Sequence, residues 1–349
     1  MHPADLPDCE FRLLNDWQRD FPLTSRPYAR LGDALGLAED AVIARLRDLA
    51  ARGVVSRVGA VFRPHTLGWS TLAAVAVDEA RLESVAAAIN AYPEVNHNYE
   101  REHRYNLWFV LAAPSRARVD AVLGEIGAVA GGAVLDLPML EDFHIDLGFD
   151  LAGGGRPRAH LDGAGAAASA QRLRAGLEAE DHALAAALDD GLALVPRPYA
   201  ALAARLGWRE EAVIARLERL LALGVLRRFG VVVRHRELGY TANAMVVWDI
   251  PDQRVGEVGR RLAGEPAVTL CYRRPRRDPD WRYNLFSMVH GRDRSAVLAE
   301  VDRLRAGLSA EFDLADLTCA PLFSRRRFKQ CGTRHAPSGG GEHPLERAA

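Results

Sequence analysis

The chain contains an internal repeat, and this repeat constrains its fold more than any other feature of the sequence. Residues 26–62 read RPYARLGDALGLAEDAVIARLRDLAARGVVSRVGAVF, and residues 197–233 read RPYAALAARLGWREEAVIARLERLLALGVLRRFGVVV. The segments are aligned at a constant offset of 171 residues, because 26 corresponds to 197, and both contain AVIARL. Chance does not explain a match of this length. We therefore expect a tandem duplication and call its repeats copy one and copy two.

Apolar residues in the repeat predict a helix-turn-helix. In copy one Leu31, Leu35 and Val42 recur at helical spacing, and Gly36 interrupts the pattern where one helix must turn into the next. Gly53 is expected to end the second helix in a left-handed conformation, and the strand-forming run VVSRVGAVF after it predicts a hairpin wing. FRLLNDWQRDF and DHALAAALDDGL supply an amphipathic first helix to each copy.

A second kind of unit follows each helix-turn-helix. STLAAVAVD in copy one and TANAMVVWDI in copy two predict strands, followed by helices around 79–91 and 252–263. Copy one continues with the strands EVNHNYER and RYNLWFVLA, a helix near 115–127 and a last strand near 133–146. This β-α-β-β-α-β order predicts a ferredoxin-like sandwich, so the fold class is α+β. Because each sheet has an uncovered face, we expect the copies to pack as a pseudo-dimer, with homodimerisation as a further option.

The repeat also sets the expected domain boundaries. We predict two winged helix-turn-helix domains, two ferredoxin-like domains, a Gly/Ala-rich linker and a disordered tail. In chain order these are 1–65 and 66–150 for copy one, 151–175 for the linker, 176–236 and 237–333 for copy two, and 334–349 for the tail.

Composition excludes several classes of protein. Lys and Arg number 45 against 46 Asp and Glu, so no global positive charge draws the chain to nucleic acid. Cys9, Cys271, Cys319 and Cys331 lack the CxxC spacing of structural zinc sites, and their scatter argues against a disulfide scaffold. No apolar run has the length of a membrane span, and the N-terminus lacks the features of a signal peptide. We expect a cytoplasmic protein.

The starts of the second helices argue against DNA binding. A recognition helix contacts DNA through its first turns. Here Glu39 and Asp40 begin that helix in copy one, and Glu210 and Glu211 begin it in copy two. These carboxylates suit the helix dipole but repel phosphate.

The copies diverge most in the hairpin after the second sandwich strand, which makes it the candidate site. In copy one it reads HNYEREHRYNLWFVL. Period-two spacing places His97, Tyr99 and Arg101 on one strand face, with His103 and Arg104 near the turn. Such a group can hold an anion and deliver a proton, although a single histidine is more often structural.

Copy two carries an arginine-rich version of this hairpin, CYRRPRRDPDWRYNLFSMVHG. Guanidinium groups at this density suit bidentate recognition of carboxylate or phosphate, and Tyr272, Trp281 and Tyr283 add flat surfaces. The combination indicates a planar polycarboxylate ligand, and a solvated charge run on a loop is the alternative. The arginines are Arg273, Arg274, Arg276, Arg277 and Arg282.

The last strands also differ between the copies. Copy one ends in LPMLEDFHIDLGF and copy two in APLFSRRRFKQCG, so His144 corresponds to Lys329. Each of these residues is either part of the site or structural. The sequence has no phosphate loop, nucleophile elbow, metal-spaced His/Glu pair or Rossmann fingerprint.

These motifs resemble the siroheme decarboxylase family. HNYEREHRYNLWFVL with LPMLEDFHIDLGF resembles its smaller-type subunit, and CYRRPRRDPDWRYNLFSMVHG with LFSRRRFKQ resembles the partner subunit. The resemblance covers about residues 10–150 and 175–333, and the chain is similar to the fused two-subunit form associated with heme d1 biosynthesis in denitrifying bacteria. It implies an Lrp/AsnC-type fold and a carboxy-lyase that removes the acetate carboxyl groups at C12 and C18 of siroheme, giving 12,18-didecarboxysiroheme.

The resemblance implies that siroheme is the substrate and that no cofactor and no intrinsic metal is needed. We expect His97, Arg101 and His103 to be catalytic, with either histidine as a proton donor or an axial ligand to the siroheme iron. Related decarboxylase subunits are expected partners. A tetrapyrrole-responsive transcription regulator and a purely structural subunit are the alternatives. The expected substrate-binding residues are Tyr99, Arg104, His144, Tyr272, Arg273, Arg274, Trp281, Arg282 and Lys329.

Overall fold

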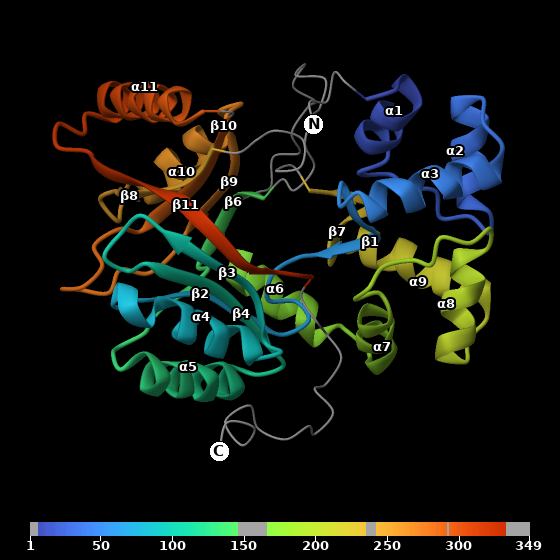
Figure 1. Cartoon of the computed structure of the whole chain (residues 1–349), viewed down its shortest axis with the longest axis horizontal. Coiled ribbons are helices and arrows are strands. Elements are labelled where there is room, and N and C mark those ends of the chain that lie inside the picture. The colour runs from blue at the N-terminus through green and yellow to red at the C-terminus, as the bar shows by residue number, and fades with distance from the viewer. Residues whose placement is uncertain (1–5, 146–165, 235–241, 292, 333–349) are drawn as a thin grey trace. The chain divides into compact units, whose positions relative to one another are not determined.

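The computed structural model describes residues 6–145, 166–234, 242–291 and 293–332 and divides into two compact units (Figure 1). One unit contains the helix-turn-helix segments of both copies, and the other contains their sheet segments. The predicted tail and most of the predicted linker lie outside the described residues. A helix, α6 (Ala166–Ala175), occupies the end of the linker region.

The helical unit has the predicted helix-turn-helix in each copy. Proline begins the first of the two helix-turn-helix helices in both copies, where its missing N–H costs nothing. Gly36 and Gly207 end these helices at φ values of 67° and 68°, a left-handed conformation that favours glycine. The helices are α1 (Asp8–Asp16), α2 (Pro27–Leu35) and α3 (Glu39–Ala51) in copy one, and α7 (Ala179–Ala187), α8 (Pro198–Leu206) and α9 (Glu210–Ala222) in copy two.

The prediction of a hairpin wing in each copy is wrong. Each copy supplies one strand, β1 (Val55–Phe62) or β7 (Leu226–Val233), and these two strands pair with each other antiparallel. Gly230 allows the close approach, because a Cβ there would lie 2.4 Å from the carbonyl oxygen of Trp17. Both strands contribute to a core shared by the helices of both copies, so pairing between copies replaces pairing within each copy.

The sheet unit follows the predicted β-α-β-β-α-β order, and its strands join into one nine-stranded sheet. Copy one supplies β2 (Trp69–Val75), β3 (Val95–Arg101), β4 (Leu107–Ala113), β5 (Leu135–Pro138) and β6 (Glu141–Ile145). Copy two supplies β8 (Ala242–Asp249), β9 (Val268–Arg273), β10 (Leu285–Gly291) and β11 (Thr318–Gln330). The spatial order is β5-β2-β4-β3-β11-β8-β10-β9-β6.

The last strand of each copy crosses into the other copy. The first part of β11 pairs with β8 of its own copy, and the second part pairs with β3 of copy one. In copy one, two separate strands make the corresponding pairings: β5 pairs with β2 of its own copy, and β6 pairs with β9 of copy two. The single strand predicted near 133–146 is therefore two strands.

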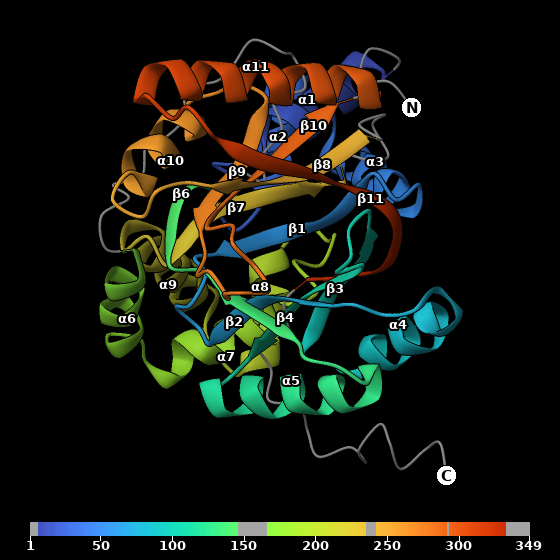
Figure 2. The ribbon, with the colours of Figure 1, turned by 90° about the vertical axis from the view of Figure 1, so that its left-hand side faces the viewer.

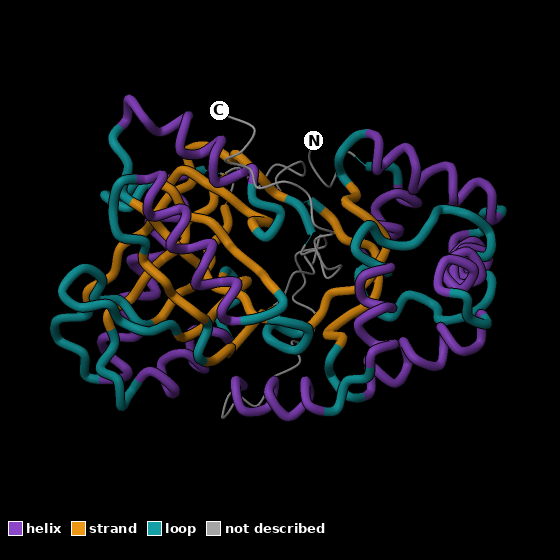
Figure 3. The backbone as a smooth tube through the Cα atoms, turned by 90° about the horizontal axis from the view of Figure 1, so that it is seen from below, coloured by secondary structure: helices purple, strands orange, loops and turns teal. Residues whose placement is uncertain are grey.

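Helices cover one face of this sheet, and the copies cover each other on the other face. The helices α4 (Leu82–Ala91) and α5 (Arg116–Ala130) pack on the copy-one half, and α10 (Val255–Ala263) and α11 (Arg294–Phe312) pack on the copy-two half (Figures 2 and 3). A short 3-10 helix, η2 (Glu79–Arg81), precedes α4.

The opposite face holds a core in which residues of both copies are in contact, including Leu72 and Trp108 of copy one with Met245 and Phe286 of copy two. The expected pseudo-dimer is confirmed for this unit. No helix in the described ranges has the combined length and apolar character needed to cross a membrane.

Candidate active site

Three side chains of copy one lie together on the face of β3 that is turned toward copy two. His97, Tyr99 and Arg101 alternate along the strand, as predicted, and Tyr99 pairs across the ladder with Trp108 of the shared core. The rings of His97 and Tyr99 stack with their centroids 6.2 Å apart. The guanidinium carbon of Arg101 lies 5.6 Å from the centroid of the Tyr99 ring.

Arg101 is a buried cation without a carboxylate partner among the described residues. Its exposed fraction is 8%, and Nη1 donates to the carbonyl oxygen of Leu322 in copy two at 3.0 Å. Its Nε is buried and has no hydrogen-bond partner. Burial lowers the pKa of Arg101, and the groups that favour its charge are the tyrosines Tyr272 and Tyr99. Because a guanidinium remains protonated in proteins, this position favours binding of an anion.

Copy two repeats the arrangement with Tyr272 and Arg274. The exposed fraction of Arg274 is also 8%, its Nη1 donates to the carbonyl oxygen of Leu137 in copy one, and its Nε is buried without a partner. Its guanidinium carbon lies 4.6 Å from the centroid of the Tyr272 ring, and burial lowers its pKa. Leu137 and Leu322 pair with equivalent strands of their own copies, so the two arginines link the copies reciprocally.

Two asparagines hold the turns that carry these arginines. The side chain of Asn106 accepts the backbone N–H of Val77 at 2.9 Å and donates to its carbonyl at 2.7 Å. Asn284 makes the same two bonds with Ile250, at 3.0 and 2.8 Å. The carbonyls of both asparagines accept the backbone N–H of the arginine in their hairpin. Both asparagines are therefore hairpin structure.

His103 lies in the turn after β3 and is partly buried. Its Nδ1 accepts the backbone N–H of Tyr105 at 3.1 Å, so the hydrogen of the neutral ring is on Nε2. Burial lowers the pKa of His103, and the charge of Arg104 lowers it further. His97 has the other tautomer, because its Nδ1 lies 2.8 Å from Oδ1 of Asn96, which can only accept. Burial lowers the pKa of His97 to about 4.

Trp281 lies in the segment that copy two inserts and fills the centre of an aromatic cluster. Its exposed fraction is 1%, and its ring centroid lies 5.2 Å from Trp108, 5.0 Å from Tyr283 and 5.4 Å from His103. The indole Nε1 is buried without a hydrogen-bond partner. Trp281 is thus a core residue that also contacts His103.

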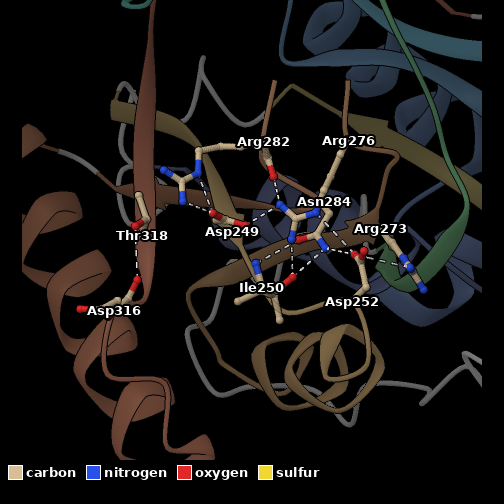
Figure 4. Close-up of polar contacts among 9 residues, drawn as sticks. All are labelled: Asp249, Ile250, Asp252, Arg273, Arg276, Arg282, Asn284, Asp316 and Thr318. Carbon is tan, nitrogen blue, oxygen red and sulfur yellow. Dashed lines mark hydrogen bonds and ion pairs between the residues drawn. The ribbon is translucent and has the colours of Figure 1, made fainter. Parts of the chain in front are cut away.

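Two arginines predicted to hold substrate carboxylates are paired with aspartates of the chain itself (Figure 4). Arg282 forms an ion pair with Asp249, with Nη2 2.5 Å from Oδ2, and Arg276 binds the other oxygen of Asp249. Arg273 lies 3.8 Å from Asp252. The sequence analysis did not assign these aspartates, although the motif WDIPD places both at the end of a predicted strand. The contacts of these arginines therefore lie within the chain and stabilise the hairpin.

Three further predicted residues lie outside this group. Arg104 is exposed and pairs with Asp280 at 2.9 Å. Lys329 donates to two carbonyl oxygens at the end of α4, at 2.8 and 3.0 Å. His144 is buried opposite Cys271, on the sheet face covered by α10. His144 and Lys329 are therefore equivalent, as predicted, but both lie on the helix-covered face.

The fold and site together define a duplicated protein with a helix-turn-helix unit and a sheet unit in which each copy's hairpin carries a buried arginine. The AsnC-like ligand binding domain model matches residues 66–144 and 237–329, and the siroheme decarboxylase NirDL-like HTH domain model matches residues 10–55 and 181–227. The siroheme decarboxylase NirDL subunit of Paracoccus denitrificans is 46% identical over 325 residues, covering 93% of this chain and 96% of the relative. The chain belongs to the siroheme decarboxylase NirDL family.

Relatives that are about as long as one copy, and solved structures, also match this family. In Stutzerimonas stutzeri the siroheme decarboxylase NirD subunit is 56% identical and the NirL subunit 50% identical, covering 40% and 43% of this chain and 92% and 86% of those subunits. The crystal structure of the siroheme decarboxylase NirDL matches with a TM-score of 0.68 at 30% identity, covering 98% of this chain and 97% of that one. Its co-complex with an iron-uroporphyrin III analogue matches with a TM-score of 0.65 at 30% identity, covering 94% and 93%.

Proposed function

We propose that the chain removes the acetate carboxyl groups at C12 and C18 of siroheme and releases 12,18-didecarboxysiroheme for heme d1 biosynthesis. The observation that carries this proposal is the pair of buried arginines, Arg101 and Arg274, whose charges have no carboxylate partner at hydrogen-bond distance. Aromatic rings lie beside both guanidinium groups. Buried cations beside flat side chains suit a planar ligand with many carboxylates. The tetrapyrrole analogue bound by a related structure supports the same ligand class.

The proposed reaction is a carboxy-lyase step without a redox change. The bond between the acetate methylene and its carboxyl carbon breaks, carbon dioxide leaves, and a proton takes its place, so that a methyl group remains. The electron pair of the broken bond receives the proton. The reaction therefore needs cations that orient carboxylates, an acid, and protection from bulk water. No cofactor besides the substrate is part of the proposal.

We assign different roles to the two histidines. His97 carries its hydrogen on Nδ1 and its lone pair on Nε2, and a pKa of about 4 keeps the ring neutral at pH 7. A neutral imidazole nitrogen suits an axial ligand to the siroheme iron. His103 carries hydrogen on Nε2, and its backbone N–H donates to the carbonyl of Arg101 at 2.9 Å. His103 is therefore adjacent to the carboxylate-binding residue, and its lowered pKa makes its protonated form a stronger acid.

The transcription-regulator alternative has less support. In the helical unit Glu39 pairs with Arg26, and Glu210 binds Arg197 and Ser25. These acids begin the two second helices, so the arginines beside them already have carboxylate partners. Both kinds of decarboxylase half are present in this chain, which also weighs against a purely structural subunit. Assembly with related subunits or with a second copy of the chain remains a prediction.

The test is anaerobic incubation of the purified chain with siroheme, followed by mass spectrometry. We expect loss of two carboxyl groups from the tetrapyrrole. The variant His103→Ala should bind siroheme but slow the reaction by about 10²- to 10⁴-fold, the usual contribution of a positioned acid. His182→Ala is the matched control, because His182 is exposed in the helical unit. An unchanged tetrapyrrole with the wild-type chain would refute the function, and a full rate for His103→Ala would remove that residue from the mechanism.

A further inference from the structure

We infer that Arg101 and Arg274 form a duplicated pair of carboxylate sites, and that one tetrapyrrole is held by both at once through two of its acetate carboxylates, one in each copy. The inference rests on the proposed function and deepens it, because it states how the substrate is bound across the two copies. Neither arginine alone would then account for binding.

The first observation is that both charges are buried without a carboxylate in direct contact, although Tyr272 and the more distant charge of Asp136 favour the protonated form of Arg274. Each side chain is 8% exposed, and neither has a carboxylate within hydrogen-bond or ion-pair distance among the described residues. By contrast, Arg276 and Arg282 of the same hairpin are neutralised by Asp249. An unpaired charge removed from water is strongly unfavourable, so a protein that retains two of them gains from an anionic ligand.

The second observation is that the two arginines are equivalent by duplication. Aligning Tyr99 with Tyr272 places Arg274 at the position of Arg101, whereas Leu270 occupies the position of His97. Each arginine donates from Nη1 to a backbone carbonyl of the other copy. The histidine has been kept in one copy only, but the arginine and its anchor are present in both. The carboxylate-binding arginine is therefore duplicated, whereas the histidine assigned as the iron ligand is not.

The third observation concerns the location of the two charges. Arg274 lies over the Tyr272 ring, and the charge of Arg101 also interacts electrostatically with Tyr272. The ring beside Arg101 belongs to Tyr99 and the ring beside Arg274 belongs to Tyr272. Their cross-strand partners, Trp108 and Phe286, lie in the core that the copies share, so both guanidinium groups lie at this shared face. Like charges in a poorly solvated place repel each other. A ligand that carries two carboxylates on one rigid frame neutralises both.

The fourth observation is the hydrogen-bonding capacity that remains. With Nη1 of Arg101 bound to Leu322, the side edge formed by Nε and Nη2 makes no hydrogen bond to a described residue. That edge is the one that receives a carboxylate through two parallel N–H···O bonds. The buried Nε of Arg274 offers the equivalent donor in copy two.

The test compares two iron porphyrins that differ in the relevant groups. Iron-uroporphyrin III carries acetates and propionates, and iron-coproporphyrin III has methyl groups in place of the acetates. Binding of each is measured by absorbance titration of the wild-type chain and of Arg101→Met, Arg274→Met and the double variant. Arg294→Met is the control, because Arg294 makes an exposed ion pair with Glu102 across the copies.

We expect one iron-uroporphyrin III per wild-type chain. Each single variant should weaken its affinity by about tenfold or more, and the double variant should weaken it further, because each charge-assisted carboxylate contact contributes on that scale. Affinity for iron-coproporphyrin III should change little in the same variants. Arg101→Lys keeps the charge but loses the two-pronged contact, and it should show the same selective loss to a smaller extent.

Three results would overturn the inference. A single variant that keeps full affinity at half the wild-type stoichiometry would mean two independent sites. Unchanged affinity for iron-uroporphyrin III would mean that the arginines do not bind acetate. Equal loss of both porphyrins, with a lower urea midpoint of the ligand-free variants, would mean that the arginines only join the copies. Siroheme turnover is measured separately, so a chain that binds as expected but leaves siroheme unchanged would contradict the function and not the binding mode.

Discussion

His97 and His103 belong to one hairpin, but their partners give them opposite tautomers. An amide oxygen receives the hydrogen on Nδ1 of His97, whereas a backbone N–H occupies Nδ1 of His103. The sequence predicted that both histidines lie in the site, with either one as the proton donor or the iron ligand. Their roles follow from Asn96 and from the turn at Tyr105, and residue spacing alone does not encode these contacts.

The low pKa of His97 predicts a pH-dependent stability. The folded pKa is about 4 and the unfolded value is about 6.5, so the unfolded chain binds the proton first as pH falls. The free energy of unfolding should therefore fall between about pH 6.5 and pH 4, with a contribution from His97 of about 2–3 kcal/mol. Urea denaturation of the wild-type chain and His97→Asn at pH 7 and pH 4.5 measures this difference. The same pH dependence in both proteins would contradict the assignment.

At the scale of elements, the two hairpins depend on equivalent asparagine contacts with the preceding strand. Asn284 is 1% exposed and makes both bonds to Ile250, so its loss leaves the buried N–H of Ile250 without a partner and the carbonyl with Arg276 as its donor. Asn284→Ala should lower the free energy of unfolding by about 1–3 kcal/mol. Asn106→Ala should have a similar effect, because Asn106 makes the same contacts. Denaturant unfolding is the measurement, with exposed Gln253→Ala as the control. A cost no larger than that of the control would contradict the role.

The inserted segment of copy two should depend on Trp281. Truncation in a well-packed core leaves a cavity, so Trp281→Ala should cost about 3–5 kcal/mol in the free energy of unfolding. Trp281→Phe keeps an aromatic ring and removes an indole N–H that has no partner, so its cost should be less than half as large. Urea unfolding followed by circular dichroism compares the two variants. Equal costs would show that ring volume does not determine the stability of this cluster.

The elements themselves were largely predictable from the sequence, but their partners were not. Apolar spacing located the helix-turn-helix helices and the β-α-β-β-α-β order, since these depend on local periodicity. VVSRVGAVF was correctly predicted to form a strand, but its partner is β7 of the other copy and not a neighbouring strand. The segment near 133–146 divides because its second part pairs with β9. Pairing between copies depends on contacts distant in sequence, which a local pattern does not specify.

The same limit separates the predictable and unpredictable parts of the site. His97, Tyr99 and Arg101 of β3 were placed correctly on one face, because alternation is a local property of a strand. The number of arginines in the copy-two hairpin did not show that Arg274 and Arg282 have different partners. One is buried against a carbonyl of copy one and the other is exposed and paired with Asp249. Only the fold determines which cations are already neutralised.

At the scale of the whole molecule, the exchange of last strands makes each half incomplete without the other. β6 of copy one forms an edge strand on copy two, and β11 of copy two extends across β3 of copy one. The shared aromatic core and the two reciprocal arginines add contacts between the copies. Exchanged strands and a common core together make the sheet unit a single folding unit in which neither copy has a complete sheet of its own.

This arrangement predicts that the covalent connection between the copies is not needed once the chain has folded. A specific protease site placed within residues 151–165 should yield two fragments that elute together on native size exclusion. They should separate only in denaturant, because parting them breaks two strand ladders and exposes the apolar core that the copies share. The cut chain should also keep its affinity for iron-uroporphyrin III, since Arg101 and Arg274 stay anchored to the opposite fragments. Separate elution of the fragments in native buffer would mean that the connection, and not the exchanged strands, holds the copies together.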